Sequence, residues 1–152
     1  MAAEIDGDFV VFLIGMRFNH PLRVRQWWPV AAAMPRMLQA LAQHPGLGCL
    51  GTHQWFGRTT VLLQYWRDFD SLDRFARDRD LPHLEPWRRF NRAIRDSGEV
   101  GVWHEAYLVR AGEYEAVYGN MPPVGLGKAG RLVPIANSVR GRDRLHAAEA
   151  GR

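Results

Sequence analysis

The sequence predicts an α+β domain whose elements follow the order strand, helix, strand, strand, helix, strand. An apolar β-rich run comes first, two further β-rich runs meet at a short glycine turn, and the helical runs carry apolar residues every three or four positions. This is the order of the ferredoxin-like βαββαβ domain, whose antiparallel sheet carries its helices on one face. A chain of 152 residues is long enough for one such domain.

The first strand is predicted over Phe9–Phe18, a continuously apolar run typical of a central strand covered on both faces. Asn19-His20-Pro21 ends it. The helical run from Trp27 to Leu41 contains Pro35, which should kink the helix or restart it. His44-Pro45-Gly46 then stops the helix.

Two strands are predicted over residues 48–56 and 59–67, joined at Gly57-Arg58 as a hairpin. A loop of these two residues would pair Trp55 with Thr60, His53 with Leu62 and Gly51 with Gln64. That register gathers polar and aromatic side chains on one face of the hairpin. The residues that it places together are His53, Trp55, Gln64 and Trp66.

The second helical region begins near residues 68–71, where aspartate and serine are plausible N-caps. Leu81-Pro82 interrupts it, and Ser97-Gly98 ends it. Trp87 and Asn91 are four residues apart and should share one face of this helix.

The last strand is predicted over residues 99–109, with Trp103, Glu105 and Tyr107 on one side and Val102, His104 and Ala106 on the other. Large apolar groups would then also occupy the sheet face that the helices do not cover. The simplest cover is the same face of a second copy. We therefore expect a homodimer built sheet against sheet.

The domain is expected to end at residue 112, because the helical and strand periods stop near Tyr114. Residues 113–136 should form an irregular Gly/Pro-rich C-terminal arm, either a lid over a pocket or an arm that packs on the dimer partner. Gly127-Lys128 resembles part of a phosphate-binding loop, but Ala129 stands where that motif requires a hydroxyl. Residues 137–152 are expected to be disordered.

Charge and cysteine usage narrow the classes of partner. The net charge is +4, but the basic excess lies after Leu126, so the folded part is neutral and nucleic-acid binding is not expected. Cys49 is the single cysteine, which excludes an internal disulfide and fits a reducing cytoplasm. No histidine pair has zinc-ligand spacing, so no metal is expected. No apolar run approaches the ~20 residues that span a bilayer, and no signal peptide is recognisable.

Aromatic walls with a few hydrogen-bonding groups are typical of a small-molecule site. His53 and His104 are the candidate bases, since histidine titrates near neutral pH. Asn91 lies on an apolar stripe and must find a partner, either in the core or on a ligand. The alternative is that these groups only occupy a sheet edge or the dimer interface. The residues expected to contact substrate are Trp55, Gln64, Trp66, Trp87, Trp103, Tyr118 and Met121.

Five blocks stand in the order FVVFLIGMRFN, WFGRTTVLLQYWR, PHLEPWRRFNRAI, GVWHEAY and YGNMPPVGLGKAGRL. Together they resemble a family of small bacterial and fungal proteins grouped with a fumagillin-pathway monooxygenase. That family is similar in turn to the antibiotic biosynthesis monooxygenases of the dimeric α+β barrel superfamily. The match spans about residues 8 to 136.

The resemblance implies a dimeric α+β barrel and oxygen chemistry on an aromatic, phenolic or enolisable metabolite, with no cofactor. In such chemistry the deprotonated substrate itself reduces O2, while the protein supplies a base and hydrogen bonds from groups such as His53, Gln64, Trp66 and Asn91. One alternative is a haem-dependent dehydratase or oxygenase of the same fold, with His53, His83 or His104 as the axial ligand. Another is a non-catalytic dimer that binds a small ligand.

Overall fold

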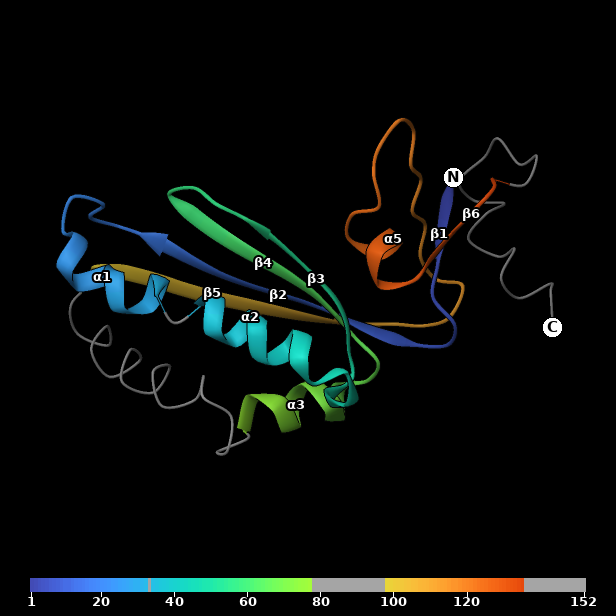
Figure 1. Ribbon diagram of the computed structural model, residues 1–152, viewed down its shortest axis with the longest axis horizontal. Coiled ribbons are helices and arrows are strands. Elements are labelled where there is room, and N and C mark those ends of the chain that lie inside the picture. Colours follow the sequence, from blue (N-terminus) through green and yellow to red (C-terminus); the bar gives the residue numbers. More distant parts are fainter. Residues whose placement is uncertain (33, 78–97, 136–152) are drawn as a thin grey trace.

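The computed structural model describes residues 1–32, 34–77 and 98–135 of the chain. Its main sheet has four antiparallel strands in the order β3-β4-β2-β5. The helices lie together on one side of this sheet (Figure 1). This arrangement confirms the predicted ferredoxin-like fold. The elements of this part are β2 (Phe9–Phe18), α1 (Val24–Ala31), α2 (Met34–Gln43), the 3-10 helix η1 (Pro45–Leu47), β3 (Cys49–Trp55), β4 (Thr59–Trp66), α3 (Phe69–Arg77) and β5 (Val100–Val109).

Proline divides the first helical run, as expected. Helix α1 ends at Ala31 and α2 begins at Met34, so Pro35 lies in the first turn of α2. Proline is tolerated there because the first backbone N–H groups of a helix have no intrahelical acceptor.

Helix α3 begins with a side-chain cap. The backbone N–H of Ser71 donates to Oδ1 of Asp68 at 2.6 Å, which confirms the predicted N-cap. Hydrogen bonds from the side chain and the backbone of Ser71 lower the pKa of Asp68.

A buried carboxylate fixes the start of α1. Glu99, which precedes β5, is buried and pairs with Arg23 and with Nδ1 of His20 at 3.1 Å. Asn19 supports the same junction, since its Nδ2 donates to the backbone oxygen of Gly98 at 2.8 Å. These contacts tie the end of β2 and the beginning of α1 to β5.

The main core lies between the sheet and the helices. Trp66 and Val10 of the sheet pack there against Leu41 of α2 and against Leu72 and Phe75 of α3. The indole of Trp66 contacts the ring of Phe75 with centroids 5.2 Å apart. We call this side of the sheet the helix face and the opposite side the open face.

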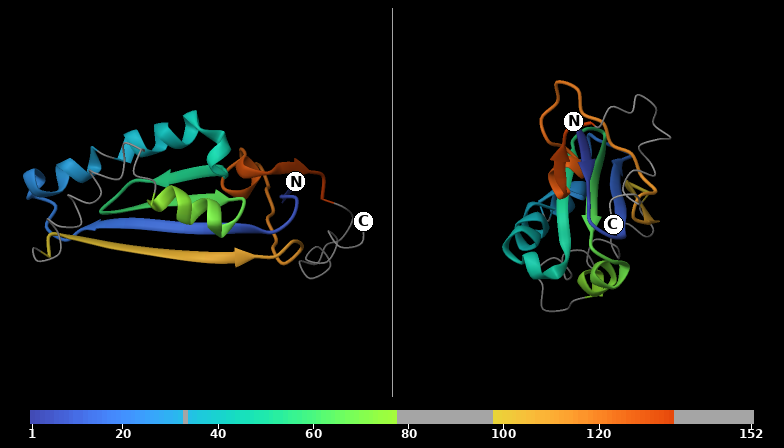
Figure 2. Two further views of the ribbon diagram at one scale, coloured as in Figure 1. Left: turned by 90° about the horizontal axis from the view of Figure 1, so that it is seen from below. Right: turned by 90° about the vertical axis from the view of Figure 1, so that its right-hand side faces the viewer.

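The C-terminal arm builds a small second layer that the sequence pattern did not reveal. Strand β6 (Arg131–Val133) pairs with β1 (Ala2–Glu4) in a two-stranded sheet, and the short helix α5 (Leu126–Ala129) precedes it. This part stands at one end of the main sheet (Figures 1 and 2). Arg131 fastens it, with its NH1 donating to both carboxylate oxygens of Asp6 at 2.8 Å and its NH2 to Glu4 at 3.0 Å.

The arm covers one end of the open face of its own chain. Phe9, on that face, packs with Ala3 and Leu126, and its ring meets Tyr114 edge to face at 5.0 Å. Burial, and secondarily the neighbouring Tyr118, raise the pKa of Tyr65 beneath the arm. The arm therefore lies on the side of the sheet opposite the helices.

The predicted hairpin register is wrong by one residue. Trp55 pairs with Val61 rather than Thr60, and His53 pairs with Leu63. The turn is longer than two residues because Arg58 is tied to the end of β2: its backbone oxygen accepts from Phe18 N at 2.9 Å, and its Nε donates to Phe18 O at 3.3 Å. A shift of one residue moves a strand's side chains to the other face.

Gly130→Ala should loosen the arm. A methyl group at Gly130 would lie 2.1 Å from the backbone oxygen of Glu4, so β1 and β6 would have to separate. Overpacking of this kind costs about 1–3 kcal/mol. We expect a lower urea midpoint and faster limited proteolysis within the arm. Gly119→Ala is the matched control, because a methyl group there meets nothing within 4 Å. Equal proteolysis of both variants would contradict this account of the arm.

Candidate functional site

Cross-strand pairing on the helix face brings a polar set of side chains together. Gln64 of β4 lies opposite Phe12 of β2 on one side and Thr52 of β3 on the other. Phe12 lies opposite Ala106 of β5, two residues from His104. Directly opposed residues of antiparallel strands point to the same face. We call Thr52, Gln64, Phe12 and His104 the helix-face cluster.

Gln64 is the most buried polar member of this cluster. Its side chain is 2% exposed, and its Oε1 accepts a hydrogen bond of 2.9 Å from Nε1 of Trp66, which is 0% exposed. The amide nitrogen of Gln64 forms no hydrogen bond with any described residue. Among the described residues, the two N–H groups of the Gln64 amide, at the buried face of the sheet, therefore have no acceptor.

His104 belongs to the same cluster but reaches solvent. Its imidazole packs on the ring of Phe12, with centroids 5.8 Å apart and the planes tilted by 40°. Within the described ranges, the imidazole nitrogens form no hydrogen bond, so they are free to exchange a proton with a ligand. Phe12 therefore lies between a buried donor and an accessible base.

His53 and Trp55 lie on the open face, away from this cluster. Their rings contact each other with centroids 4.3 Å apart. His53 shares a row with Leu63, Leu13 and Glu105, whereas His104 shares one with Ile14 and Leu62. The predicted grouping of His53 and Trp55 with Gln64 and Trp66 is therefore wrong, because the register shift places the two pairs on opposite faces.

Trp103 also belongs to the open face. Its indole packs over Gly15 of β2, where a methyl group would lie 1.5 Å from a carbon of the ring. The side chain is 37% exposed. Two residues along β5, the hydroxyl of Tyr107 donates to Glu105 at 2.6 Å, and this bond raises the pKa of Tyr107.

Tyr118 and Met121 belong to the arm and lie away from the helix-face cluster. The hydroxyl of Tyr118 donates to the backbone oxygen of Val124 at 2.6 Å and accepts from Gly127 N at 2.8 Å, so it closes the arm's own loop. Met121 is exposed on that loop. Asn91, Trp87 and His83 lie outside the described residues.

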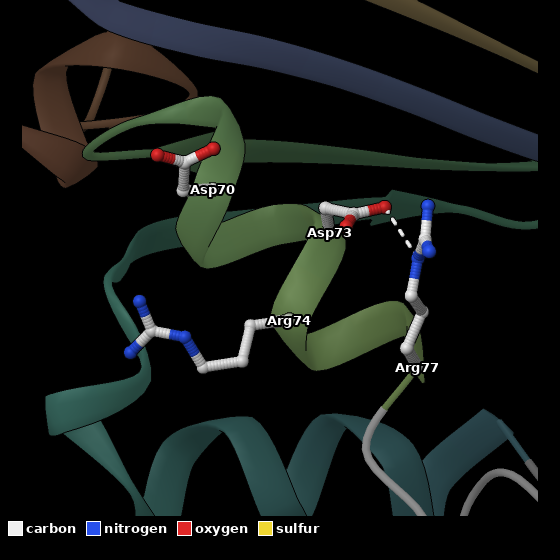
Figure 3. A pocket seen from close by; sticks show the side chains of 4 residues that line it. All are labelled: Asp70, Asp73, Arg74 and Arg77. Atoms are coloured by element: carbon white, nitrogen blue, oxygen red, sulfur yellow. Dashed lines mark hydrogen bonds and ion pairs between the residues drawn. The ribbon is translucent and has the colours of Figure 1, made fainter.

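A shallow hollow on the outer surface of α3 is lined by charged side chains (Figure 3). Asp73 accepts from Nε of Arg77 at 2.9 Å, while Arg74 points away from that pair. Exposed ion pairs of this kind are ordinary on helix surfaces. We assign no chemistry to this hollow.

No group of histidine, cysteine, aspartate and glutamate side chains within the described ranges could hold a metal ion. Likewise, none of the helices described is long and apolar enough to cross a membrane.

The comparison with protein families decides the relationship of this chain. Residues 9–126 match the model of the family described as Monooxygenase af470-like. The chain belongs to this family. The sequence resemblance drawn from the five blocks is thereby confirmed.

A curated relative of the af470-like family is Monooxygenase af470 from Aspergillus fumigatus, 31% identical over 133 residues. These residues cover 80% of this chain but 46% of the relative, so the chain spans less than half of the relative's length. A solved aldoxime dehydratase in complex with butyraldoxime has a TM-score of 0.56 at 15% identity, over 72% of this chain and 33% of that one. SnoaB, a cofactor-independent oxygenase from Streptomyces nogalater, has a TM-score of 0.45 at 18% identity, over 68% of this chain and 94% of SnoaB.

Two members of the helix-face cluster were not selected from the sequence of this af470-like chain. Phe12 belongs to the apolar run of the first predicted strand, and the predicted hairpin register places Thr52 on the face opposite Gln64. The signal that finds them is the register, since both are direct cross-strand neighbours of Gln64.

The thiol of Cys49 should react slowly with disulfide reagents. Burial raises its pKa to about 11, so roughly one part in a thousand would be thiolate at pH 8. We expect a disulfide reagent to label the folded protein at least ~100-fold more slowly than the urea-unfolded chain at that pH. Raising the pH from 8 to 9 should speed the folded protein about tenfold and the unfolded chain about threefold. Equal labelling rates for the folded protein and the unfolded chain would show that burial does not protect the thiol.

Proposed function

We propose that this domain is a monooxygenase-like enzyme that acts on an aromatic, phenolic or enolisable small molecule with O2, with its site at the helix-face cluster. The observation that carries the proposal is the buried Gln64 amide, whose N–H groups have no acceptor among the described residues, placed beside Phe12 on the face that also carries His104. Apolar walls with a few convergent polar groups are the usual composition of a small-molecule site. Family membership supports the reaction class.

In the proposed reaction His104 is the base. It removes a proton from an activated carbon or from a phenolic hydroxyl of the substrate, and the electron pair remains on the substrate as an enolate or a phenolate. This anion passes one electron to O2, and the two radicals combine into a carbon–oxygen bond. Protonation of the distal oxygen gives a hydroperoxide. Where the same carbon carries a second hydrogen, loss of that proton and cleavage of the O–O bond release water and leave a carbonyl.

Haem is the alternative cofactor for the same face. The imidazole nitrogens of His104 form no hydrogen bond with any described residue, so among the histidines of the described strands it is the one that would hold the haem iron, whereas the ring of His53 meets Trp55 edge to face at the open face. Haem would supply an iron centre for dehydration or oxygen activation. Titration with haemin distinguishes the two: a Soret band that His104→Ala abolishes would favour haem over the cofactor-independent reaction.

The second part of the proposal is a homodimer formed through the open face. Beyond the arm, this face presents Val61, Leu13 and Trp103 without cover from the described helices. A contiguous apolar face of a sheet is stable when another layer buries it. A second copy supplies such a layer with the same flat, apolar surface.

His104→Ala should lower substrate-dependent O2 uptake at least ~100-fold, the lower range of what general-base catalysis contributes. His53→Ala is the matched control and should keep near-wild-type uptake, because it lies on the other face. Oxygen electrode measurements over a panel of phenols and enolisable ketones check this. If His53→Ala abolished uptake and His104→Ala did not, the site would belong to the open face. Tight ligand binding without O2 uptake would instead favour the non-catalytic binding protein.

Trp103→Glu should convert the dimer into monomers, because it places a charge on the proposed interface. Leu22→Glu, at a side chain that is 94% exposed before α1, should leave the dimer intact. Sedimentation at micromolar concentration measures both variants, with far-UV circular dichroism to verify the fold. A monomeric wild-type protein would contradict the dimer.

A further inference from the structure

Core packing alone does not explain why a glutamine forms a buried hydrogen bond with Trp66. It occupies the amide oxygen of Gln64 and leaves the amide nitrogen without an acceptor among the described residues. Both side chains are almost completely buried. A buried donor without an acceptor is unfavourable, and an aliphatic side chain would fill the same volume without that penalty.

We propose that Trp66 is a positioning residue, which fixes the Gln64 amide so that its N–H groups bind an oxyanion of the ligand. The inference deepens the proposed function and rests on it for the location of the site. It names the ligand class as an aromatic phenolate or enolate, whose oxygen accepts from Gln64.

The Trp66 N–H sets the direction of the amide. A glutamine amide can turn about its terminal bond and present either oxygen or nitrogen to a neighbour. Because the Trp66 N–H can only donate, it holds the oxygen of Gln64 toward itself and directs the nitrogen away. The ring of Trp66 also packs against Phe75, a contact that does not involve the indole N–H of Trp66 in its bond to Gln64.

The polarity of the helix face favours an anion. The four strands of the main sheet contain one acidic residue, Glu105, and it lies on the open face. On the helix face, Thr52, which carries a hydroxyl, is the cross-strand neighbour of Gln64, and His104 becomes cationic once it has taken a proton. Donors without competing carboxylates stabilise a negatively charged oxygen.

Phe12 gives the ligand its orientation. It is the direct cross-strand neighbour of Gln64, and its ring contacts His104. A planar aromatic ligand stacked on Phe12 would have Gln64 near one edge and His104 near another. The proton leaves toward His104, and the resulting negative charge is held at Gln64.

The test uses 4-nitrophenol, because its anion absorbs visible light and its ionisation can be titrated while it is bound. For the wild-type protein we expect the bound probe to ionise at lower pH than the free probe. Gln64→Leu should weaken binding of the anion about tenfold or more, and Trp66→Phe should do so several-fold, while binding of neutral 4-nitroanisole stays unchanged in both. Phe75→Leu, which alters the packing of Trp66 but not its N–H, should leave anion selectivity at the wild-type level.

The double variant separates positioning from packing. If Trp66 acts through Gln64, Trp66→Phe combined with Gln64→Leu should weaken anion binding no more than Gln64→Leu alone. Additive losses, equal losses for the neutral probe, or a wild-type protein without preference for the anion would each overturn the inference. These measurements need no turnover, so they are independent of O2 uptake. Loss of uptake in His104→Ala tests the proposed function separately.

Discussion

The pairing of β4 with its two neighbours is the constraint on which the chemistry of this domain depends. Side chains alternate between faces along each strand, so one register assigns every residue of the hairpin to one side of the sheet. The observed pairs place Gln64 and Trp66 under the helices, with Thr52 and Phe12 beside them, and place His53 on the other side. A different register would divide the same residues into different sites.

Strand and helix positions could be predicted because local pattern decides them. The apolar run Phe9–Phe18 coincides with β2, Pro35 lies where the helix restarts, and Asp68 caps α3. The hairpin register could not be predicted from the local pattern, because contacts between residues distant in sequence determine it. Arg58 is held by Phe18 across the sheet, and a register shift between Cys49 and Gly51 adjusts the far end of β3.

The arm escaped prediction for the same reason. Its strands have three residues each, too short to show a period, and their pairing joins the two ends of the described chain. Tyrosine hydroxyls supply much of its order: Tyr114 accepts from Ile5 N at 2.8 Å and donates to Ile5 O at 3.0 Å. Tyr118 does the same within the arm. A tyrosine hydroxyl in such a segment can therefore hydrogen-bond to backbone groups of its own chain rather than to a ligand.

The two faces of the sheet differ in the side chains that they present. Near its middle the open face presents Val61, Gly15 and Trp103 in one row, a flat apolar surface suited to another layer. The helix face is also mainly apolar, yet it retains the amide of Gln64 in a fully buried position. Burying that amide without an acceptor among the described residues opposes folding, whereas burial would strengthen the hydrogen bond to an anion that we propose. In the proposed site, the low exposure of Gln64 thus costs the free protein stability and would give the site its affinity for an anion, provided that Trp66 keeps the amide N–H groups facing the ligand.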